Sequence, residues 1–167
     1  TSMAMGFQVL SAAHIAATGA TLKECKAVAE KAVRQSGIDF VVNTLEFLHR
    51  GGRIGGAQAF MGTMLNMKPV LELQHGRIEP VDRVRTFTKA LDRLLDIVEN
   101  KMAHEAGPIR LSVVHANSLR AAESLLERAI KRFPTSLVTD AVISAISPVI
   151  GTHVGPGALG IAYMYGM

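Results

Sequence analysis

The hydrophobic positions of this 167-residue chain recur with a helical period in some segments and alternate in others. Between residues 88 and 104 they recur every three or four positions, which predicts an amphipathic helix with one apolar face. That face is made by Leu91, Leu94, Leu95, Val98 and Met102.

Segments 70–74 and 77–85 alternate apolar and polar residues on either side of His75-Gly76, which predicts a β-hairpin. Pro69 and Pro80 cannot donate to a strand ladder. We therefore expect the hairpin to lie at the edge of a sheet.

A strand–helix–strand unit follows at 109–115, 118–133 and 137–144. Ser118 stands where a helix N-cap is expected, and Pro134 ends the helical pattern. A strand, a helix and a second strand in this order favour two neighbouring parallel strands.

The start of the chain predicts two more helices. Residues 3–18 are nearly all apolar, so we expect a helix that is buried on most faces and ends at Gly19. Thr21 and Glu24 have the spacing of a capping box, which predicts a second helix to about Gln35.

The remaining expected elements are a strand at 38–43, a helical turn at 45–48, a tight loop at 50–53, a helix at 57–65 and a last buried strand at 158–164. Together these elements predict one mixed α/β domain over 1–167, a mixed sheet flanked by helices.

Composition supports a folded protein, because 49% of the residues are hydrophobic and 19% are charged. The net charge of +4 comes from basic residues scattered among acidic ones, which argues against a nucleic-acid partner.

The first 22 residues and segment 141–167 lack charged side chains, but glycines interrupt both, and prolines interrupt the second. We interpret them as buried core elements rather than stable membrane insertions. The one cysteine, Cys25, forms no internal disulfide and suggests a reducing cytoplasm.

The glycine-rich run at 147–160 holds one imidazole, His153, among small residues. Glycine lets the main chain approach a bound group, and histidine can donate to a carboxylate. We therefore take His153, Thr152, Gly151 and Gly155 as candidate ligand-binding residues. The alternative is that His153 is an ordinary structural histidine.

Arg50-Gly51-Gly52-Arg53 places two guanidiniums on a flexible turn, and Arg53 could reach a carboxylate or phosphate. On spacing alone a solvated turn is the favoured interpretation. His115-Ala116-Asn117 lies at the carboxyl end of a predicted strand, where ligands often bind. We favour the simpler view, in which Asn117 and Ser118 turn the chain and cap the next helix.

Motifs for catalysis do not occur in the sequence. It has no Walker A segment, no GxGxxG opening a helix, no GxSxG and no HxxxH or HxH pair. Neither an enzyme, nor a metal site, nor a cofactor is therefore expected.

Eight methionines and few aromatic residues suit an adaptable apolar cavity for an alkyl chain. Met61, Met64, Phe60 and Leu65 are the candidates for such a tail pocket. Ordinary core filling is the alternative.

The chain resembles the DegV family of fatty-acid-binding proteins over essentially its whole length. The runs that carry the resemblance are Met5-Gly6-Phe7-Gln8-Val9-Leu10, Thr44-Leu45-Glu46-Phe47-Leu48-His49-Arg50-Gly51-Gly52-Arg53-Ile54-Gly55, Leu65-Asn66-Met67-Lys68-Pro69-Val70-Leu71, Gly76-Arg77-Ile78-Glu79-Pro80-Val81, Val84-Arg85-Thr86, His115-Ala116-Asn117 and 148–160.

The resemblance implies the C-terminal domain of a two-domain cytoplasmic bacterial protein whose N-terminal domain is absent here. Its ligand would be a long-chain fatty acid such as palmitate, with the tail in an apolar tunnel. The protein would be a non-catalytic acyl carrier that presents the carboxylate to a separate fatty acid kinase subunit, which makes acyl phosphate for phospholipid synthesis. His153 would join the hydrogen bonds around the carboxylate, and Arg53 would face the carboxylate or the kinase.

Two positions depart from the family pattern. Ser147 stands where glycine is common, and Val154 where threonine is common, which removes a hydroxyl beside His153. Two other functions stay open: a stand-alone hydrolase or phosphotransferase that uses His153 with Arg53, and a regulatory domain that senses lipid.

Overall fold

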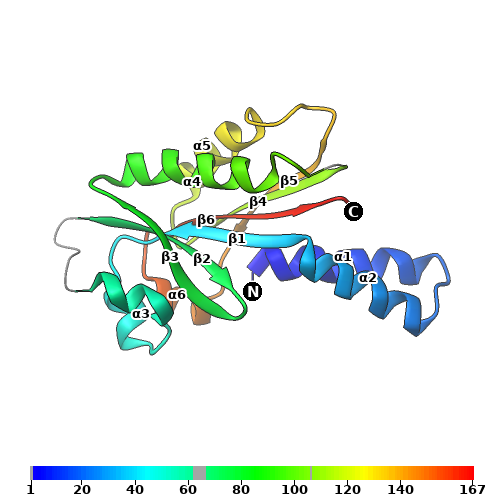
Figure 1. The fold of residues 1–167 in the computed structure, drawn as a ribbon, viewed down its shortest axis with the longest axis horizontal. Coiled ribbons are helices and arrows are strands. Elements are labelled where there is room, and N and C mark those ends of the chain that lie inside the picture. Colours follow the sequence, from blue (N-terminus) through cyan, green and yellow to red (C-terminus); the bar gives the residue numbers. More distant parts are fainter. Residues whose placement is uncertain (1, 62–66, 106) are drawn as a thin grey trace.

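The computed structural model describes residues 2–61, 67–105 and 107–167, and it has a mixed sheet with helices on both faces (Figure 1). The helices are α1 (Ser2–Ala17), α2 (Leu22–Arg34), α3 (Glu46–Arg50), the 3-10 helix η1 (Gly55–Phe60), α4 (Phe87–Met102), α5 (Leu119–Ile130) and α6 (Pro148–Val154). The strands are β1 (Ser36–Val41), β2 (Lys68–Gln74), β3 (Arg77–Val84), β4 (Ile109–His115), β5 (Val138–Ala145) and β6 (Leu159–Tyr165). The predicted mixed α/β fold is confirmed.

The six strands lie in the order β3-β2-β1-β6-β4-β5. Every neighbouring pair is antiparallel except β4 and β5, which are parallel, as the strand–helix–strand pattern predicts. The hairpin is confirmed, but its expected edge position holds only for β3, because β2 lies between β3 and β1. Pro69 is tolerated in β2 because it lies beyond the last residue pair with β1, Val41 and Val70.

Helices α4 and α5 cover one face of the sheet, and their apolar residues form its main core with the strands. Thr86 caps α4 by accepting a hydrogen bond from the Lys89 amide at 3.3 Å. The predicted face of this helix is confirmed: Leu94, Leu95, Val98 and Met102 are buried, and Leu91 packs against the same core. This face therefore holds the sheet in place from one side.

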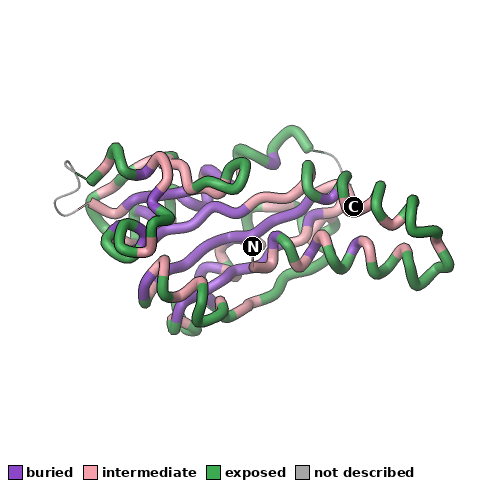
Figure 2. Tube along the Cα trace, turned by 90° about the horizontal axis from the view of Figure 1, so that it is seen from below, coloured by how far each residue is buried: buried purple, intermediate pink, exposed green. Residues whose placement is uncertain are grey.

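The opposite face is covered in two parts. Helix α1 crosses one end of it, with α2 packed alongside, while α3, η1 and α6 lie over the other end (Figure 1). Figure 2, seen from below, shows buried residues running along the central strands between these two parts. The part of the sheet between them is where the cavity described below lies.

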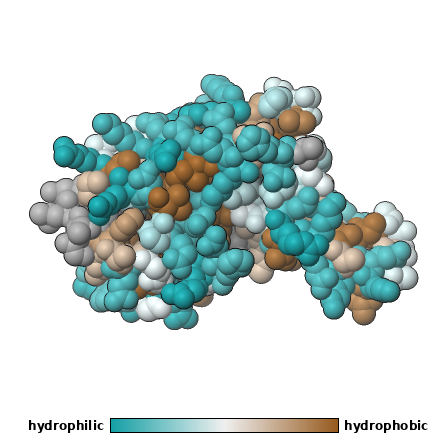
Figure 3. All heavy atoms as spheres, in the orientation of Figure 1, coloured by the Kyte–Doolittle hydropathy of each residue, from teal (hydrophilic) through white to brown (hydrophobic). Residues whose placement is uncertain are grey.

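The prediction that 3–18 is a helix buried on most faces is wrong about burial. Only Ala4, Phe7 and Ser11 are buried within α1, whereas the side chains of Met5 and Val9 are 54% and 59% exposed. Figure 3 shows hydrophobic atoms at the surface of the hairpin formed by α1 and α2, at the lower right of the view. An all-apolar helix carries no moment that marks its buried side, so the pattern could not tell which face meets the sheet.

The capping box is present as predicted, since the Thr21 amide donates to Glu24 Oε2 at 2.7 Å and the Glu24 amide donates back to Thr21 Oγ1. The helix expected at 57–65 is different: the described part is the short 3-10 helix η1, and residues 62–66 lie outside the described residues. Gly55 has a positive φ of 54° and lies against the Ile78 carbonyl of β3, so the chain turns tightly there.

A buried ion pair ties α4 to the middle of the sheet. Lys101 Nζ lies 2.7 Å from Asp39 Oδ1 and 2.6 Å from Glu72 Oε2, and Asp39 is completely buried. Burial raises the pKa of Asp39, and Lys101 opposes this only in part. Burial alone would lower the pKa of Lys101, but attraction to the two carboxylates outweighs it and raises that pKa.

Tyr163 of β6 lies beside this ion pair, and we expect it to make the fold sensitive to alkaline pH. Burial, and then the charge of Asp39, raise the pKa of Tyr163 above its ordinary value of 10.0. Above about pH 10 the unfolded chain releases the phenol proton while the folded chain keeps it, so the free energy of unfolding falls as the pH rises. Lys101, whose pKa is also raised, acts in the same direction. Urea unfolding between pH 8 and 11 should show this fall, and Tyr163→Phe should make it shallower; an equal slope in the variant would contradict the prediction.

Candidate functional site

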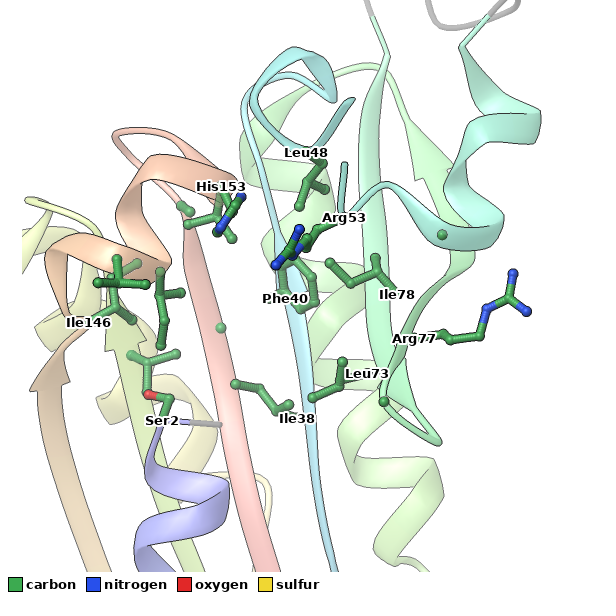
Figure 4. A pocket seen from close by; sticks show the side chains of 18 of the residues that line it. Ser2, Ile38, Phe40, Leu48, Arg53, Leu73, Arg77, Ile78, Ile146 and His153 are labelled. Atoms are coloured by element: carbon green, nitrogen blue, oxygen red, sulfur yellow. The ribbon is translucent and has the colours of Figure 1, made fainter. Parts of the chain in front are cut away.

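A cavity of about 470 Å³ opens on the face of the sheet opposite α4. Its walls come from the five strands β1, β2, β3, β4 and β6, from α6 and from the loop after α3, and most of the wall residues are apolar. Its apolar lining includes Ile38, Phe40, Leu73, Ile78, Val114 and Ile146. Figure 4 shows Ile38, Phe40, Leu73, Ile78 and Ile146 around one space.

Strand alternation produces the floor of this cavity. Ile38 and Phe40 of β1 point into it, whereas Asp39 between them points to the other face and meets Lys101. Gly160 of β6 lies opposite Phe40, and a Cβ there would lie 2.9 Å from Phe40 Cβ and 3.1 Å from Val114 Cγ2. A side chain at Gly160 would therefore crowd the floor.

The polar end of the cavity holds His153 and Arg53, which come from α6 and from the loop after α3 (Figure 4). Arg53 Nη1 donates to the Gly51 carbonyl at 3.2 Å. His153 Nδ1 is buried and has no hydrogen-bond partner among the described residues. Val154 also lines the cavity, so the wall beside the imidazole is apolar. The structure thus brings together two cationic or hydrogen-bonding side chains that are far apart in the sequence.

The opposite end of the cavity is formed by Ile38, Leu73 and Ser2, the last at the start of α1 (Figure 4). Two of these side chains are apolar, and the hydroxyl of Ser2 is uncharged. Arg77 borders the cavity too, but its side chain points away and pairs with Glu79 at 3.6 Å. The site is therefore amphipathic, with the side chains of His153 and Arg53 at one end and an uncharged end opposite them.

Helix α6 carries His153, and the sequence pattern did not reveal this helix within the glycine-rich run. Ser147 is its N-cap and accepts a hydrogen bond from the Ile150 amide at 3.4 Å, and Pro148 occupies the first turn. Serine followed by proline is a common helix start, and this signal could have predicted the element. Gly155 ends the helix with a positive φ of 76°, where a Cβ would lie 2.4 Å from the ring of Phe47.

The other predicted ligand-binding residues of this run do not line the cavity. The Thr152 hydroxyl donates to the Val149 carbonyl within α6 at 2.8 Å. Outside its own helix and chain neighbours, no described atom lies within 4 Å of a Cβ built on Gly151, and Gly155 serves the contact between α3 and α6. Their assignment as ligand contacts stays a prediction, and the geometry gives them a place beside His153 rather than at the cavity.

The predicted tail-pocket residues also lie elsewhere, as far as the structure describes them. Phe60 lies under the Arg83 guanidinium, 5.2 Å from ring centroid to Cζ, and Met61 is 42% exposed. Met64 and Leu65 lie outside the described residues. The cavity walls instead come from strand residues such as Leu73 and Ile78. Their alternation was visible in the sequence, but the pattern could not show that both face a cavity.

The His115-Ala116-Asn117 segment turns the chain between β4 and α5. Asn117 has a positive φ of 52°, and the Ser118 amide donates to His115 Nδ1 at 3.2 Å. Ser118 is the N-cap residue, but its side chain makes no capping hydrogen bond. The favoured interpretation is confirmed for the turn and wrong for the side-chain cap.

Within residues 2–61, 67–105 and 107–167, no three His, Cys, Asp or Glu side chains come together as a possible metal site. In the same ranges, no helix combines the length and the apolar character needed to cross a membrane.

The chain is similar in sequence to known proteins over nearly its whole length. A family model described as "Uncharacterised protein, DegV family" matches residues 1–166. A DegV domain-containing protein of Streptomyces coelicolor is 41% identical over 160 residues, which is 96% of this chain and 56% of that protein. Protein DegV of Bacillus subtilis is 35% identical over 98% of this chain and 57% of its own length. The chain thus spans about half the length of the curated relatives it matches.

The fold is also similar to solved structures of DegV proteins. A fatty-acid-binding DegV family protein from Thermus thermophilus has a TM-score of 0.87 and 37% identity, over 96% of this chain and 56% of its own. DegV of Bacillus subtilis, described as a fatty acid binding protein, has a TM-score of 0.81 and 32% identity, over 98% of this chain and 57% of its own.

Proposed function

This chain belongs to the DegV family, and from that membership we propose that its cavity holds the tail of a long-chain fatty acid. The observation that carries the proposal is the amphipathic cavity itself, which is apolar along its walls and has His153 and Arg53 at one end. Its volume of about 470 Å³ lies within the range of small-molecule sites. Solved DegV structures with the same fold are described as fatty acid binding.

The apolar walls would supply most of the affinity. Each methylene moved from water into such a cavity contributes about 0.8 kcal/mol. The residues that would do this are those of the strand floor, Ile38, Phe40 and Val114, with Leu73 and Ile78 at the side. The tail would therefore lie along the sheet, below α6.

The carboxylate would lie at the His153 and Arg53 end. An arginine guanidinium is always charged and can donate two parallel hydrogen bonds to a carboxylate. The imidazole of His153 can add a third donor. These side chains would orient the head group while the tail contributes the binding free energy.

We further propose that the protein is a cytoplasmic, non-catalytic carrier, which presents the carboxyl group to a separate kinase subunit for acyl-phosphate formation. The absence of nucleophile and nucleotide motifs from the sequence supports this proposal. A stand-alone hydrolase or phosphotransferase using His153 with Arg53, or a lipid-sensing regulatory domain, would be the other outcomes of the tests below.

The domain organisation is proposed on the same basis. The chain would be the lipid-binding domain of a two-domain protein, because it spans 56% of a curated relative. The exposed apolar side chains of α1 and α2, such as Val9 and Val33, suit a face that another part of such a protein covers.

Lipid binding is tested directly on the full-length protein. Native mass spectrometry after gentle purification should show a mass increment, and denaturation should release a long-chain fatty acid that can be identified. An empty protein that also fails to take up added palmitate would overturn the proposed ligand.

The carrier role makes a separate prediction for His153. His153→Ala should leave the apolar walls intact, and so retain most tail binding, yet lower acyl-phosphate formation in the presence of the kinase subunit and ATP. Unchanged turnover would remove His153 from the site. Incubating the parent protein with ATP and oleate but no kinase is the control, since product in that tube would replace the carrier with an enzyme.

A further inference from the structure

Gly51 connects the two polar side chains of the cavity. Its carbonyl accepts the hydrogen bond from Arg53 Nη1 at 3.2 Å. Its α-carbon faces the imidazole of His153, so that a Cβ built there would lie 2.1 Å from Nδ1 and 2.9 Å from Cε1. No side chain can occupy this position while the His153 ring stays where it is.

The backbone at Gly51 does not itself require glycine. Its φ of −79° and ψ of −3° are ordinary right-handed values that alanine adopts without strain. Its amide donates to the Phe47 carbonyl at 2.9 Å, as in any helix end. Gly52, with a φ of 66°, is the residue that needs its glycine for the turn. The backbone conformation therefore does not explain why residue 51 lacks a side chain.

We infer that Gly51 is a positioning residue that makes room for the His153 imidazole at the polar end of the cavity. The Nδ1 edge of the ring lies against Gly51, where it is buried and without a partner among the described residues. This leaves Nε2 as the nitrogen that can reach a ligand, so a neutral ring must carry its proton there in order to donate to a carboxylate. An alanine at position 51 forces the ring to swing away, and the donor moves with it. The inference rests on the proposed function, since it names what sets the geometry of that site.

The test is a double-mutant cycle in the full-length protein, with Gly51→Ala, His153→Ala and the double variant beside the parent. Each is titrated with palmitic acid and with 1-hexadecanol, which has the same tail length and a neutral head, by displacement of a fluorescent long-chain fatty acid. We expect each single variant to bind palmitic acid about tenfold more weakly, the effect of losing one charge-assisted hydrogen bond. Affinity for 1-hexadecanol should stay near that of the parent, because the tail contacts are unchanged.

The His153→Ala background is the matched control for the substitution at Gly51. Without the ring there is no clash, so adding Gly51→Ala should change nothing further, and the two effects should be non-additive. Thermal unfolding of all four proteins is measured alongside, because a Cβ at Gly51 would also lie 3.1 Å from the Phe47 carbonyl oxygen.

Three outcomes would overturn the inference. In the first, Gly51→Ala weakens the acid and the alcohol equally, which indicates a general packing defect. In the second, the two substitutions act additively, and in the third, Gly51→Ala binds the acid as the parent does. A parent protein that binds neither ligand would instead overturn the proposed function, and the inference with it.

Discussion

Replacing Lys101 with methionine is expected to destabilise the fold by about 3 kcal/mol, the lower end of the cost of breaking a buried ion pair. Asp39 is completely buried, and Lys101 is its only ion-pair partner among the described residues. The substitution would therefore leave the Asp39 carboxylate without a cation. The lower end applies because the Lys101 side chain is 32% exposed, so water can partly replace it. Small domains are stable by only about 5 to 15 kcal/mol, so the loss is easily measured by urea unfolding.

The pH dependence of this variant has a definite sign. Lys101 lowers the pKa of Asp39, so its removal raises that pKa further above the ordinary value. A group whose pKa is raised by folding favours the folded state at low pH and opposes it once it ionises. The loss in free energy of unfolding caused by Lys101→Met should therefore be smaller at pH 5 than at pH 8.

Two controls separate this effect from the loss of any lysine. Lys26 pairs with Glu30 at 3.7 Å on the surface, where the two side chains are 74% and 59% exposed, so Lys26→Met should change the stability little. Adding Asp39→Asn to Lys101→Met should recover much of the loss, because it removes the unpaired charge. If Lys101→Met and Lys26→Met were equally stable, the buried pair would have no structural importance.

Replacing Ile78 with glutamate is expected to weaken palmitate binding more than about 100-fold, because the tail would have to desolvate a carboxylate without a partner. Ile78 lines the cavity from the edge strand β3. In the empty protein a glutamate there can stay hydrated, so the fold should survive. Displacement of a fluorescent fatty acid from the full-length protein measures the effect, and circular dichroism checks the fold.

Val81→Glu is the matched control on the same strand. Val81 is 37% exposed and does not line the cavity, so the same change of charge should leave palmitate binding close to that of the parent. Equal affinity of the two glutamate variants would show that the tail binds elsewhere.

Local signals predicted α2 and the buried side of α4, although the cap at Ser147 that starts α6 was missed. Thr21 and Glu24 started α2 as expected, and the spacing of Leu94, Leu95 and Val98 identified the buried side of α4. These features depend on neighbours within one or two turns, which the sequence contains directly. The burial of α1 depends instead on which strands it crosses, and no local pattern specifies that.

The same reasoning predicted the polar residues of the site but not its apolar walls. His153 and Arg53 stood out as chemical groups, and the structure places both at one cavity. The walls could not be assigned, because Ile38, Leu73 and Val114 meet only through the strand order β3-β2-β1-β6-β4-β5. Methionine content pointed to 57–65 instead, since composition carries no information on which residues face a shared space.

Asp39, between Ile38 and Phe40, has a consequence for the ligand site on the other side of the sheet. If β1 slipped by one residue against its neighbours, every side chain would exchange faces. The carboxylate would then enter the cavity, and Ile38 or Phe40 would meet Lys101. The ion pair therefore helps to specify the register of β1, because a shifted register would place the Asp39 carboxylate in the cavity, away from Lys101. The free-energy cost of that misplaced charge determines which residues line the cavity floor.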